Sequence, residues 1–412
     1  MQAFRCRFCG KGVSDRVVDL GMSPLCESYL PAESLDKMEP FYPLHVWVCS
    51  SCFLVQLNEY VRADEIFTEY AYFSSFSTAW LKHAEDYVGK MTELLQLDEK
   101  SFVMELASND GYLLQYFVKR GIPCLGIEPA ANVAKVAVEQ RSVPTEVAFF
   151  GKEKGRELKA AGKQADLVLG NNVLAQVPDL NSFVAGIPEI LKPKGTVTIE
   201  FPHVMRMIDE NQFDTIYHEH FCYFSLISAE AIFAGHGMTI FDVEELWTHG
   251  GSLRIYARHA SDTSRPVSER VLSLRKREED AGYRKVETYT AFEERVRETK
   301  RKLLELLIDL KRQGKRIAGY GAPGKGNTLL NYCGIRTDFL DFTVDRNPYK
   351  QGRFLPGTHI PIFAPEKIDE VKPDYVLILP WNFKDEIMQQ MAYVREWGCK
   401  FVVPIPTLTV YP

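Results

Sequence analysis

Residues 217–225, "YHEHFCYFS", bring together side chains that can move protons. The stretch holds histidines, a glutamate and tyrosines among other aromatic residues, a mixture that neither a solvated surface nor an apolar core requires. Histidine is suited to act as a general base near neutral pH, and a phenol can donate to a developing oxyanion. The stretch therefore predicts chemistry that needs a base, an acid and phenols in one place.

Two C-x-x-C pairs, Cys6 with Cys9 and Cys49 with Cys52, stand near the N-terminus. Thiolates at this spacing can hold one side of a tetrahedral ion, and a second pair completes the shell. Because four sulfur ligands leave no open position, we expect a structural Zn²⁺. The segment between the pairs is longer than in a zinc ribbon, so a small subdomain must fill it. The absence of a basic cluster here argues against a nucleic-acid-binding ribbon.

The elements that must position these residues are strands and helices that alternate from residue 101, the pattern of a parallel α/β sheet. The expected strands are "SFVMEL", "PCLGIEP", "ADLVLGNNVLAQV" and "KPKGTVTIEFPH". Ligands of open α/β sheets bind at the carboxyl ends of strands, where "ASNDG", Glu128 and "NNVLAQV" fall. A long amphipathic helix within 286–316 then leads to a second α/β unit.

Two strand–turn–helix segments compete for a nucleotide cofactor. The later turn, "GYGAPG" at 319–324, matches the dinucleotide fingerprint, and Asp345 stands where an acid would meet a ribose. It predicts an NAD(P)-dependent oxidoreductase of a nucleotide sugar, which is the alternative function. Its glycines equally suit the phosphates of another nucleotide, with Lys325 and Asn327 as candidate ligands.

The earlier turn, "ELASNDGYLL", resembles motif I of the class I S-adenosylmethionine-dependent methyltransferases. This resemblance implies that Glu105, at the end of the first strand, faces the amino-acid part of the cofactor. Glu128, at the end of the second strand, would accept both ribose hydroxyls, since a carboxylate offers two acceptor oxygens. The other expected cofactor-binding residues are Ala107, Asn109, Gly111, Asn171 and Asn172.

Over almost its whole length the chain resembles the sugar C-methyltransferases of deoxysugar biosynthesis. The shared segments, in order, are the double C-x-x-C head, "YAYFSSFS", "ELASNDGYLL", "GIEPA", "YHEHFCYFS", "HGGSLRIYARH" and "GYGAPGKGNTLLNYCGI". The chain departs from the family pattern at Gln176, where a histidine is expected. The resemblance implies an α/β protein of three domains: a zinc-binding head (1–75), a Rossmann-like class I methyltransferase domain (76–262) and a C-terminal Rossmann-like domain (263–412). The last would include the connecting helix and would not bind NAD.

The resemblance also implies the reaction. Family members methylate carbon 3 of a 4-keto-6-deoxy sugar linked to a nucleoside diphosphate, here expected to be dTDP. A hydrogen α to a ketone can be removed if the enolate is stabilised, which requires a base and hydrogen-bond donors. The resemblance places the base at His220, with Glu219 beside it. Tyr217 and Tyr70 are the expected donors, and "YAY" leaves Tyr72 as the alternative to Tyr70.

Composition bounds the other functions. A formal net charge of −6 and a pI of about 5.9 do not suit a protein that coats nucleic acid or an anionic membrane. The sequence shows no apolar run of the roughly 18 residues that suggest a membrane span, and its start lacks a signal peptide's apolar core. We therefore expect a cytoplasmic, S-adenosylmethionine-dependent enzyme, monomeric or dimeric, without nucleic-acid or membrane partners. A zinc-headed scaffold that only binds a partner is the remaining alternative.

Overall fold

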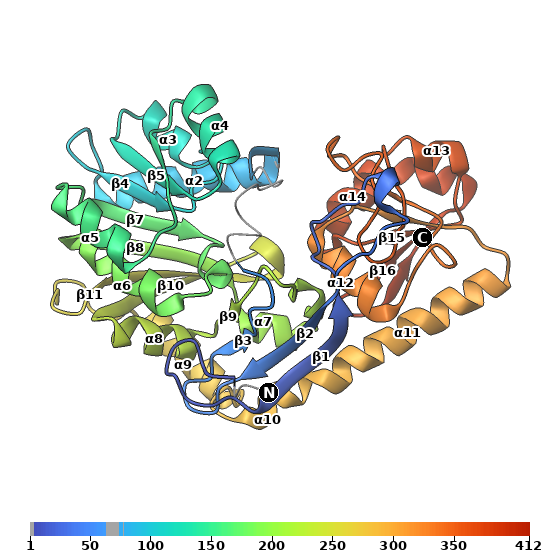
Figure 1. Ribbon diagram of the computed structural model, residues 1–412, viewed down its shortest axis with the longest axis horizontal. Coiled ribbons are helices and arrows are strands. Elements are labelled where there is room, and N and C mark those ends of the chain that lie inside the picture. Colours follow the sequence, from blue (N-terminus) through green and yellow to red (C-terminus); the bar gives the residue numbers. More distant parts are fainter. Residues whose placement is uncertain (1–3, 63–73, 77) are drawn as a thin grey trace. The chain divides into compact units, whose positions relative to one another are not determined.

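The computed structural model describes residues 4–62, 74–76 and 78–412, which form two compact units (Figure 1). Unit 1 contains the chain up to Val13 together with Cys49–His203 and Phe221–Arg284. Unit 2 contains Ser14–Val48, Val204–His220 and Lys285–Pro412. Each unit is thus assembled from segments that are distant in the sequence. The predicted boundaries at 75/76 and 262/263 follow the linear sequence and stay predictions.

A mainly parallel sheet forms the centre of unit 1. Its described strands are β4 (Val103–Leu106), β5 (Cys124–Glu128), β6 (Thr145–Val147), β7 (Ala165–Asn171), β8 (Leu191–Pro202), β10 (Met238–Leu246) and β11 (Ser252–His259). They pair in the order β10-β11-β8-β7-β4-β5-β6, and only β11 runs antiparallel to its neighbours. The order reverses between β4 and β7, and ligands of open α/β sheets bind beside such a switch point. The predicted Rossmann-like sheet is confirmed.

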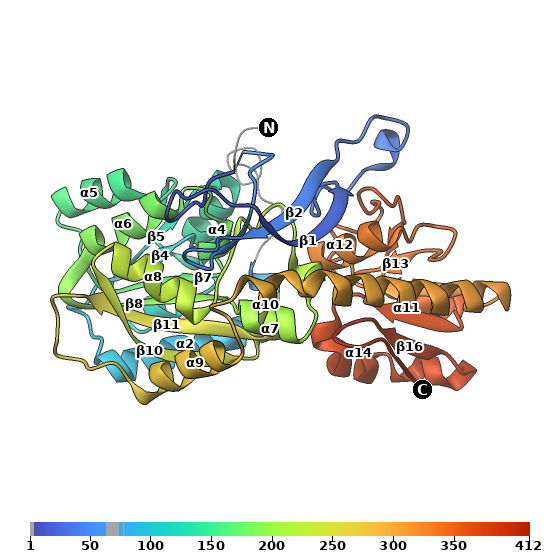
Figure 2. The same ribbon diagram turned by 90° about the horizontal axis from the view of Figure 1, so that it is seen from below.

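Helices cover both faces of this sheet. They are α2 (Thr78–Leu95), α3 (Leu114–Lys119), α4 (Ala131–Arg141), α5 (Lys152–Ala160), α6 (Leu180–Ile190), α8 (Leu226–Gly235) and α9 (Glu269–Asp280). Figure 2 shows α2 on one side of the sheet and α5 and α6 on the other. Tyr87 and Met91 of α2 pack with Phe117 of α3 and with Leu167 of β7 in a buried core. Apolar residues three to four positions apart therefore fix α2 to the sheet.

A small second sheet region belongs to the zinc-binding head of unit 1. Strand β3 (Val55–Leu57) pairs antiparallel with β9 (Cys222–Tyr223), so that Gln56 lies opposite Cys222. This pairing joins the N-terminal head to the chain that directly follows "YHEH". The head and the segment that starts at Phe221 are therefore linked within unit 1.

Unit 2 holds the second predicted α/β sheet. Outside this sheet, unit 2 contains the hairpin of β1 (Asp15–Ser23) and β2 (Tyr42–Val48). The strands of the sheet are β12 (Ile317–Tyr320), β13 (Thr343–Val344), β14 (Ile362–Phe363), β15 (Tyr375–Ile378), β16 (Lys400–Val403) and β17 (Thr409–Tyr411). Among the described residues, the sheet order is β14-β13-β12-β15-β16-β17, parallel except for β17. The helices are α7 (Val204–Asp209), α10 (Val286–Thr290), α11 (Phe292–Arg312), α12 (Gly324–Cys333), α13 (Lys367–Val371) and α14 (Lys384–Gln390).

The single connecting helix predicted between the α/β units is divided in the structure. Helix α10 ends before Ala291 and α11 begins after it, and α11 buries Val296, Leu303, Leu307 and Leu310 along one face. Most of the charged residues of α11 lie away from this face, as the amphipathic pattern predicts. In the described part of the chain, every helix is too short or too polar to cross a membrane.

Candidate active site and zinc centre

The four predicted zinc ligands lie together in unit 1. Their sulfur atoms all lie within 4.8 Å of one another, with 3.5 Å from Cys6 to Cys52 and 3.5 Å from Cys9 to Cys49. Four sulfurs held tetrahedrally at about 2.3 Å from Zn²⁺ would be separated by about 3.8 Å, so the thiolates fit one ion. In the part of the chain that the structure describes, no other group of three or more Cys, His, Asp or Glu has this geometry.

Backbone turns and one buried amide set the geometry of this centre. The Gly10 N–H donates to the Cys6 carbonyl (3.0 Å), and the Phe53 N–H donates to the Cys49 carbonyl (2.8 Å). Gly10 and Phe53 both adopt left-handed conformations, φ 71° and 57°, which end each knuckle. The Gln56 side chain donates to the Cys6 sulfur at 3.3 Å. Such outer hydrogen bonds orient metal ligands, so the fold prepares the thiolates for the ion.

Arg7 links the zinc centre to the chain after His220. Its guanidinium donates to the carbonyls of Pro178 (2.8 Å) and Leu57 (3.0 Å), and it lies 5.1 Å from the centre of the Phe221 ring. The Phe221 N–H donates to the Ala175 carbonyl at 2.7 Å. The residue that follows His220 is thus held by the zinc head and by the loop after β7. Sequence reasoning missed Arg7, because its neighbours in the sequence give no sign of these contacts.

The predicted cofactor turn follows β4 with three left-handed residues in alternation. Ala107, Asn109 and Gly111 have φ of 57°, 49° and 75°. A Cβ at Gly126 of β5 would lie 2.2 Å from the Ser108 hydroxyl oxygen, so glycine is needed there for the turn to lie against the sheet. A left-handed backbone costs free energy in residues other than glycine, such as Ala107 and Asn109. Strain of this kind concentrates at ligand sites.

Glu128 fastens this turn to the end of β5. One carboxylate oxygen accepts the Asn109 N–H (2.8 Å), and the other accepts the Ala130 N–H (2.9 Å). Burial raises the pKa of Glu128, although both N–H groups oppose the rise. Each oxygen keeps a second lone pair, which suits the predicted contact with two ribose hydroxyls. The Asn109 side chain is engaged elsewhere, because its amide oxygen accepts the Ser74 N–H at 2.9 Å.

Glu105 is fully buried in β4, and its carboxylate oxygens have no hydrogen-bond partner of good geometry in the described residues. Burial raises the pKa of Glu105 well above its usual range, and the carboxylates of Glu128 and Asp110 add to the rise, while Tyr112 opposes it. A buried acid whose charge is so poorly compensated is costly, so this site is suited to a ligand that brings hydrogen-bond donors and positive charge. The amino-acid part of S-adenosylmethionine has both.

Asn171 and Asn172 lie where β7 ends, beside the switch point. The Asn171 amide nitrogen and the Asn172 amide oxygen are buried without a hydrogen-bond partner in the described chain. Asn172 is left-handed (φ 58°), and its amide nitrogen lies 3.0 Å from the His249 ring Nε2. The Asn171 amide nitrogen needs a hydrogen-bond acceptor and the Asn172 amide oxygen needs a donor, and a bound ligand can supply both. Together they fit the predicted adenosyl cofactor.

Glu200, which sequence reasoning missed, ties several elements together behind Asn172. It is fully buried in β8, next to Asn171 in the sheet register. Burial opposes its ionisation, but His83 and Arg254 outweigh that cost and lower the pKa of Glu200 to about 2. A charged residue inside the apolar strand "TVTIEF" is the signal that the sequence offered.

The "YHEH" residues lie in unit 2, after η4 (Phe213–Thr215). The Tyr217 and His220 rings are 4.1 Å apart between centres, at 35°. His220 is 7% exposed, and its Nδ1 lies 3.2 Å from the Thr215 carbonyl oxygen. His218 instead contacts the Pro43 carbonyl through Nε2 (3.2 Å), and burial lowers its pKa.

Glu219 and the segment around Cys26 meet within unit 2. The Cys26 thiol donates to a Glu219 carboxylate oxygen at 3.7 Å, and Asn327 donates to the Cys26 carbonyl at 2.6 Å. Burial raises the pKa of Cys26 well above its ordinary value, and the charge of Glu219 raises it further. The thiol therefore remains protonated and can donate to the carboxylate. Tyr70 and its alternative Tyr72 lie outside the described residues.

The chain itself occupies the glycine-rich turn at 319–324. The Tyr29 hydroxyl donates to the Ala322 carbonyl (2.6 Å), and Asp345 accepts the Ala322 N–H (2.7 Å). A Cβ at Gly324 would lie 2.8 Å from the Cys26 sulfur. Tyr29 and Asp345 thus use both polar groups of the Ala322 main chain, and Cys26 lies against Gly324, which argues against the NAD alternative. Lys325 is likewise engaged, since it donates to the Asn382 side chain at 3.0 Å.

Three family models match the chain in sequence order. They describe a putative zinc binding domain (residues 6–67), a methyltransferase domain (80–243) and a C-methyltransferase C-terminal domain (247–406). The C-methyltransferase NovU of Streptomyces niveus is 36% identical over 401 residues, which cover 97% of this chain and 95% of that protein.

Two solved structures match part of the chain. The PH0226 protein of Pyrococcus horikoshii OT3 is 14% identical with a TM-score of 0.38, covering 48% of this chain and 97% of its own. The magnesium protoporphyrin IX methyltransferase of Synechocystis PCC 6803, with bound S-adenosylhomocysteine, is 11% identical with a TM-score of 0.34, covering 43% and 82%.

The family models and the cysteine cluster confirm two predictions, the methyltransferase activity and the structural zinc. The chain is an S-adenosylmethionine-dependent methyltransferase, and the four cysteines of its head hold a structural zinc. With 36% identity over nearly the full length of NovU, the chain belongs to the C-methyltransferase family with an N-terminal zinc-binding domain.

Proposed function

We propose that this enzyme methylates carbon 3 of a 4-keto-6-deoxy sugar linked to dTDP, after removing the proton α to the ketone. The observation that carries the proposal is the setting of His220, whose Nδ1 lies 3.2 Å from the Thr215 carbonyl oxygen. A carbonyl can only accept, so Nδ1 carries the ring proton and the lone pair is on Nε2. Nε2 is then the atom that takes the α-proton.

The neighbours of His220 suit the rest of this step. Tyr217, in ring contact with His220, is proposed to donate to the oxygen on which the enolate charge develops. Glu219 is proposed to orient the sugar hydroxyls and to favour the imidazolium that forms. Tyr70 is proposed as a second donor.

The cofactor cradle is proposed from the buried groups of unit 1. Glu128 would accept the ribose hydroxyls, Glu105 would face the cationic amino-acid part, and Asn171 and Asn172 would contact the remainder. When bound, S-adenosylmethionine supplies an electrophilic methyl group. Ala107, Asn109 and Gly111 shape the turn that lets the backbone approach the cofactor. All nine cysteines are outside disulfides, and five of them lie outside the zinc cluster, which suits a reducing compartment, so we propose a cytoplasmic location.

Mass spectrometry of the reaction products tests the proposal. Purified enzyme is incubated with S-adenosylmethionine and a dTDP-linked 4-keto-6-deoxy sugar, and the expected product is heavier by one methylene. The matched control substrate carries a hydroxyl in place of the ketone and should not react, because its ring hydrogens are not acidic. Equal methylation of both sugars would show that transfer needs no enolate and would overturn the proposal.

A further inference from the structure

Glu200 makes four contacts that join separate elements of unit 1. One carboxylate oxygen accepts the Thr248 hydroxyl (2.8 Å); the other accepts Arg254 (2.9 Å) and lies 3.1 Å from His83 Nε2. Its backbone carbonyl accepts the Asn172 N–H at 2.8 Å. The residue therefore connects α2, β11 and the turn after β10 to the loop after β7.

Two of these contacts fix the wall formed by Asn172 and His249. Glu200 holds Asn172 through the main chain, and it holds Thr248, the residue before His249, through the side chain. Asn172 and His249 both have left-handed backbones, with φ of 58° and 56°. Such conformations persist only where the surroundings hold them, and Glu200 acts on both.

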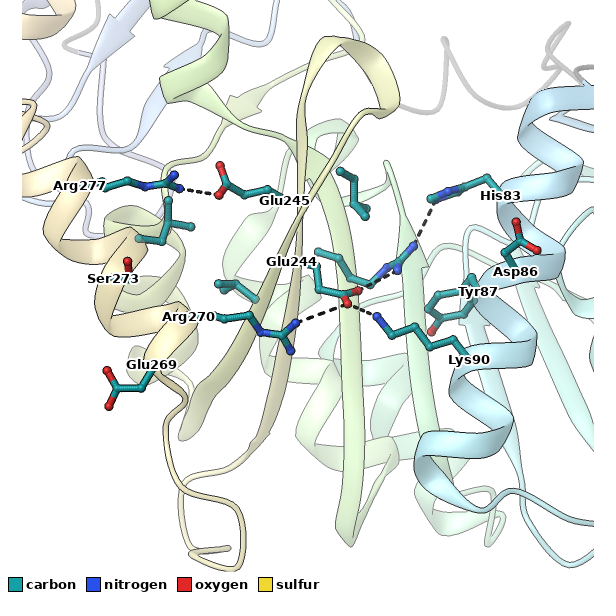
Figure 3. Close-up of a pocket in the computed structure, with 14 residues that line it drawn as sticks. His83, Asp86, Tyr87, Lys90, Glu244, Glu245, Glu269, Arg270, Ser273 and Arg277 are labelled. Carbon is teal, nitrogen blue, oxygen red and sulfur yellow. Dashed lines mark hydrogen bonds and ion pairs between the residues drawn. The ribbon is translucent and has the colours of Figure 1, made fainter.

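The opposite side of the network opens to solvent. A pocket of about 670 Å³ is lined there by α2, β10 and α9, and Figure 3 shows Lys90 and Arg270 directed at Glu244. Arg254 bridges the two carboxylates, because it also donates to Glu244 at 3.2 Å. Within the described residues, Glu244 shares the charge network through Arg254 and Tyr256 but is not hydrogen-bonded to Thr248 or Asn172. It is therefore a matched comparison for Glu200.

We propose that Glu200 is a positioning residue for the cofactor site, which holds Asn172 and His249 in place through Thr248 and the main chain. The inference rests on the proposed cofactor role of Asn172. A preformed wall costs the ligand no ordering on binding, so its loss lowers affinity for the cofactor rather than only the stability of the fold. Thr248, 1% exposed, transmits the constraint through one hydroxyl.

Calorimetric titration of the full-length zinc-loaded enzyme with S-adenosylhomocysteine tests this. Thr248→Val removes the hydroxyl while keeping the shape, and we expect affinity to fall roughly three- to tenfold, the effect of one lost hydrogen bond. Thr248→Ser restores the donor and should bind within about twofold of wild type. Glu200→Gln should weaken binding by about tenfold. Glu244→Gln should lower the melting temperature and leave the affinity unchanged.

Three results would overturn the inference. Wild-type affinity in both Thr248→Val and Glu200→Gln would remove the positioning role, and so would an equal loss of affinity in Glu244→Gln. Failure of Thr248→Ser to restore binding would show that packing, not the hydroxyl, matters. A wrong assignment of the cofactor site would give a different result. The Glu128→Ala variant would then bind S-adenosylhomocysteine as tightly as wild type.

Discussion

At the scale of single residues, Glu128 combines two tasks in one carboxylate. It accepts the N–H groups of Asn109 and Ala130, and its remaining lone pairs are proposed to bind the ribose. Glu128→Ala should weaken S-adenosylhomocysteine binding by about 2 kcal/mol, as expected for lost hydrogen bonds to a charged group. Titration calorimetry measures the change. Glu146→Ala, an acid on the neighbouring strand β6, is the control and should bind as wild type does.

At the residue scale, residue type and strand position together indicate where the predicted cofactor residues lie, while their roles stay predictions. Glu105, Glu128 and Asn171 stand near or at the ends of apolar strands, and Asn172 directly follows one. These strands are neighbours, so the four residues lie near the carboxyl ends of one sheet. Glu200 could not be assigned a role in this way, because its partners come from α2, β11 and the turn after β10. Contacts between elements that are distant in the sequence leave no spacing to detect.

At the scale of elements, the cofactor turn depends on close approach to β5. A Cβ at Gly126 would lie 2.2 Å from the Ser108 hydroxyl oxygen and 2.8 Å from its Cβ. Gly126→Ala should therefore displace the turn, destabilise the protein by about 1–3 kcal/mol and weaken S-adenosylhomocysteine binding. Chemical denaturation and calorimetry measure the two effects.

Gly89 is the matched control in helix α2. A Cβ there would meet the Arg120 guanidinium at an ordinary 3.5 Å, and alanine is the better helix former. Gly89→Ala should stabilise the protein by about 0.5–1 kcal/mol without changing cofactor affinity. If Gly126→Ala behaved in the same way, the argument from close approach would be wrong.

The zinc head contacts the chain that directly follows His220, so loss of its zinc ion should affect catalysis. Gln56 contacts the Cys6 sulfur and lies opposite Cys222, while Arg7 packs on Phe221. Cys52→Ser should lose the zinc ion and reduce methyl transfer at least tenfold, because structural zinc contributes folding free energy. Cofactor affinity should change little.

Atomic emission and turnover measured on the same sample test this prediction. Cys124→Ala, a buried thiol of β5 outside the cluster, should keep both zinc and activity. Full activity in a zinc-free Cys52→Ser enzyme would show that catalysis does not depend on the zinc-binding head.

Elements were predictable where a periodic pattern runs through them. The alternation from residue 101 gave the central sheet, and the amphipathic pattern gave α11, but the division at Ala291 has no sequence signal. The glycine-rich turn at 319–324 shows that a clear sequence motif can also mislead. Its sequence matches a dinucleotide loop, and only the contacts of Tyr29 and Cys26 show that the chain fills it.

At the scale of the whole molecule, the contacts of buried Glu200 with His83 and Arg254 link global stability to pH. Its pKa is about 2 in the folded protein against an ordinary 4.5, so the native state favours the charged form. The stabilisation, about 3 kcal/mol, is fully present above pH 4.5 and is lost as the pH falls towards 2. The difference in melting temperature between wild type and Glu200→Gln should thus shrink on acidification from pH 5 to pH 3. A difference that stays constant would contradict the lowered pKa.

The proposed methylation depends on one proton transfer, assigned to His220. The most direct measurement compares wild type with His220→Asn, using S-adenosylmethionine and the dTDP-linked keto sugar and reading the product by mass spectrometry. The account predicts that wild type adds one methylene to a ring carbon, and that His220→Asn binds S-adenosylhomocysteine normally but gives no product. Methylation by His220→Asn at the wild-type rate, or a product methylated on oxygen, would contradict it.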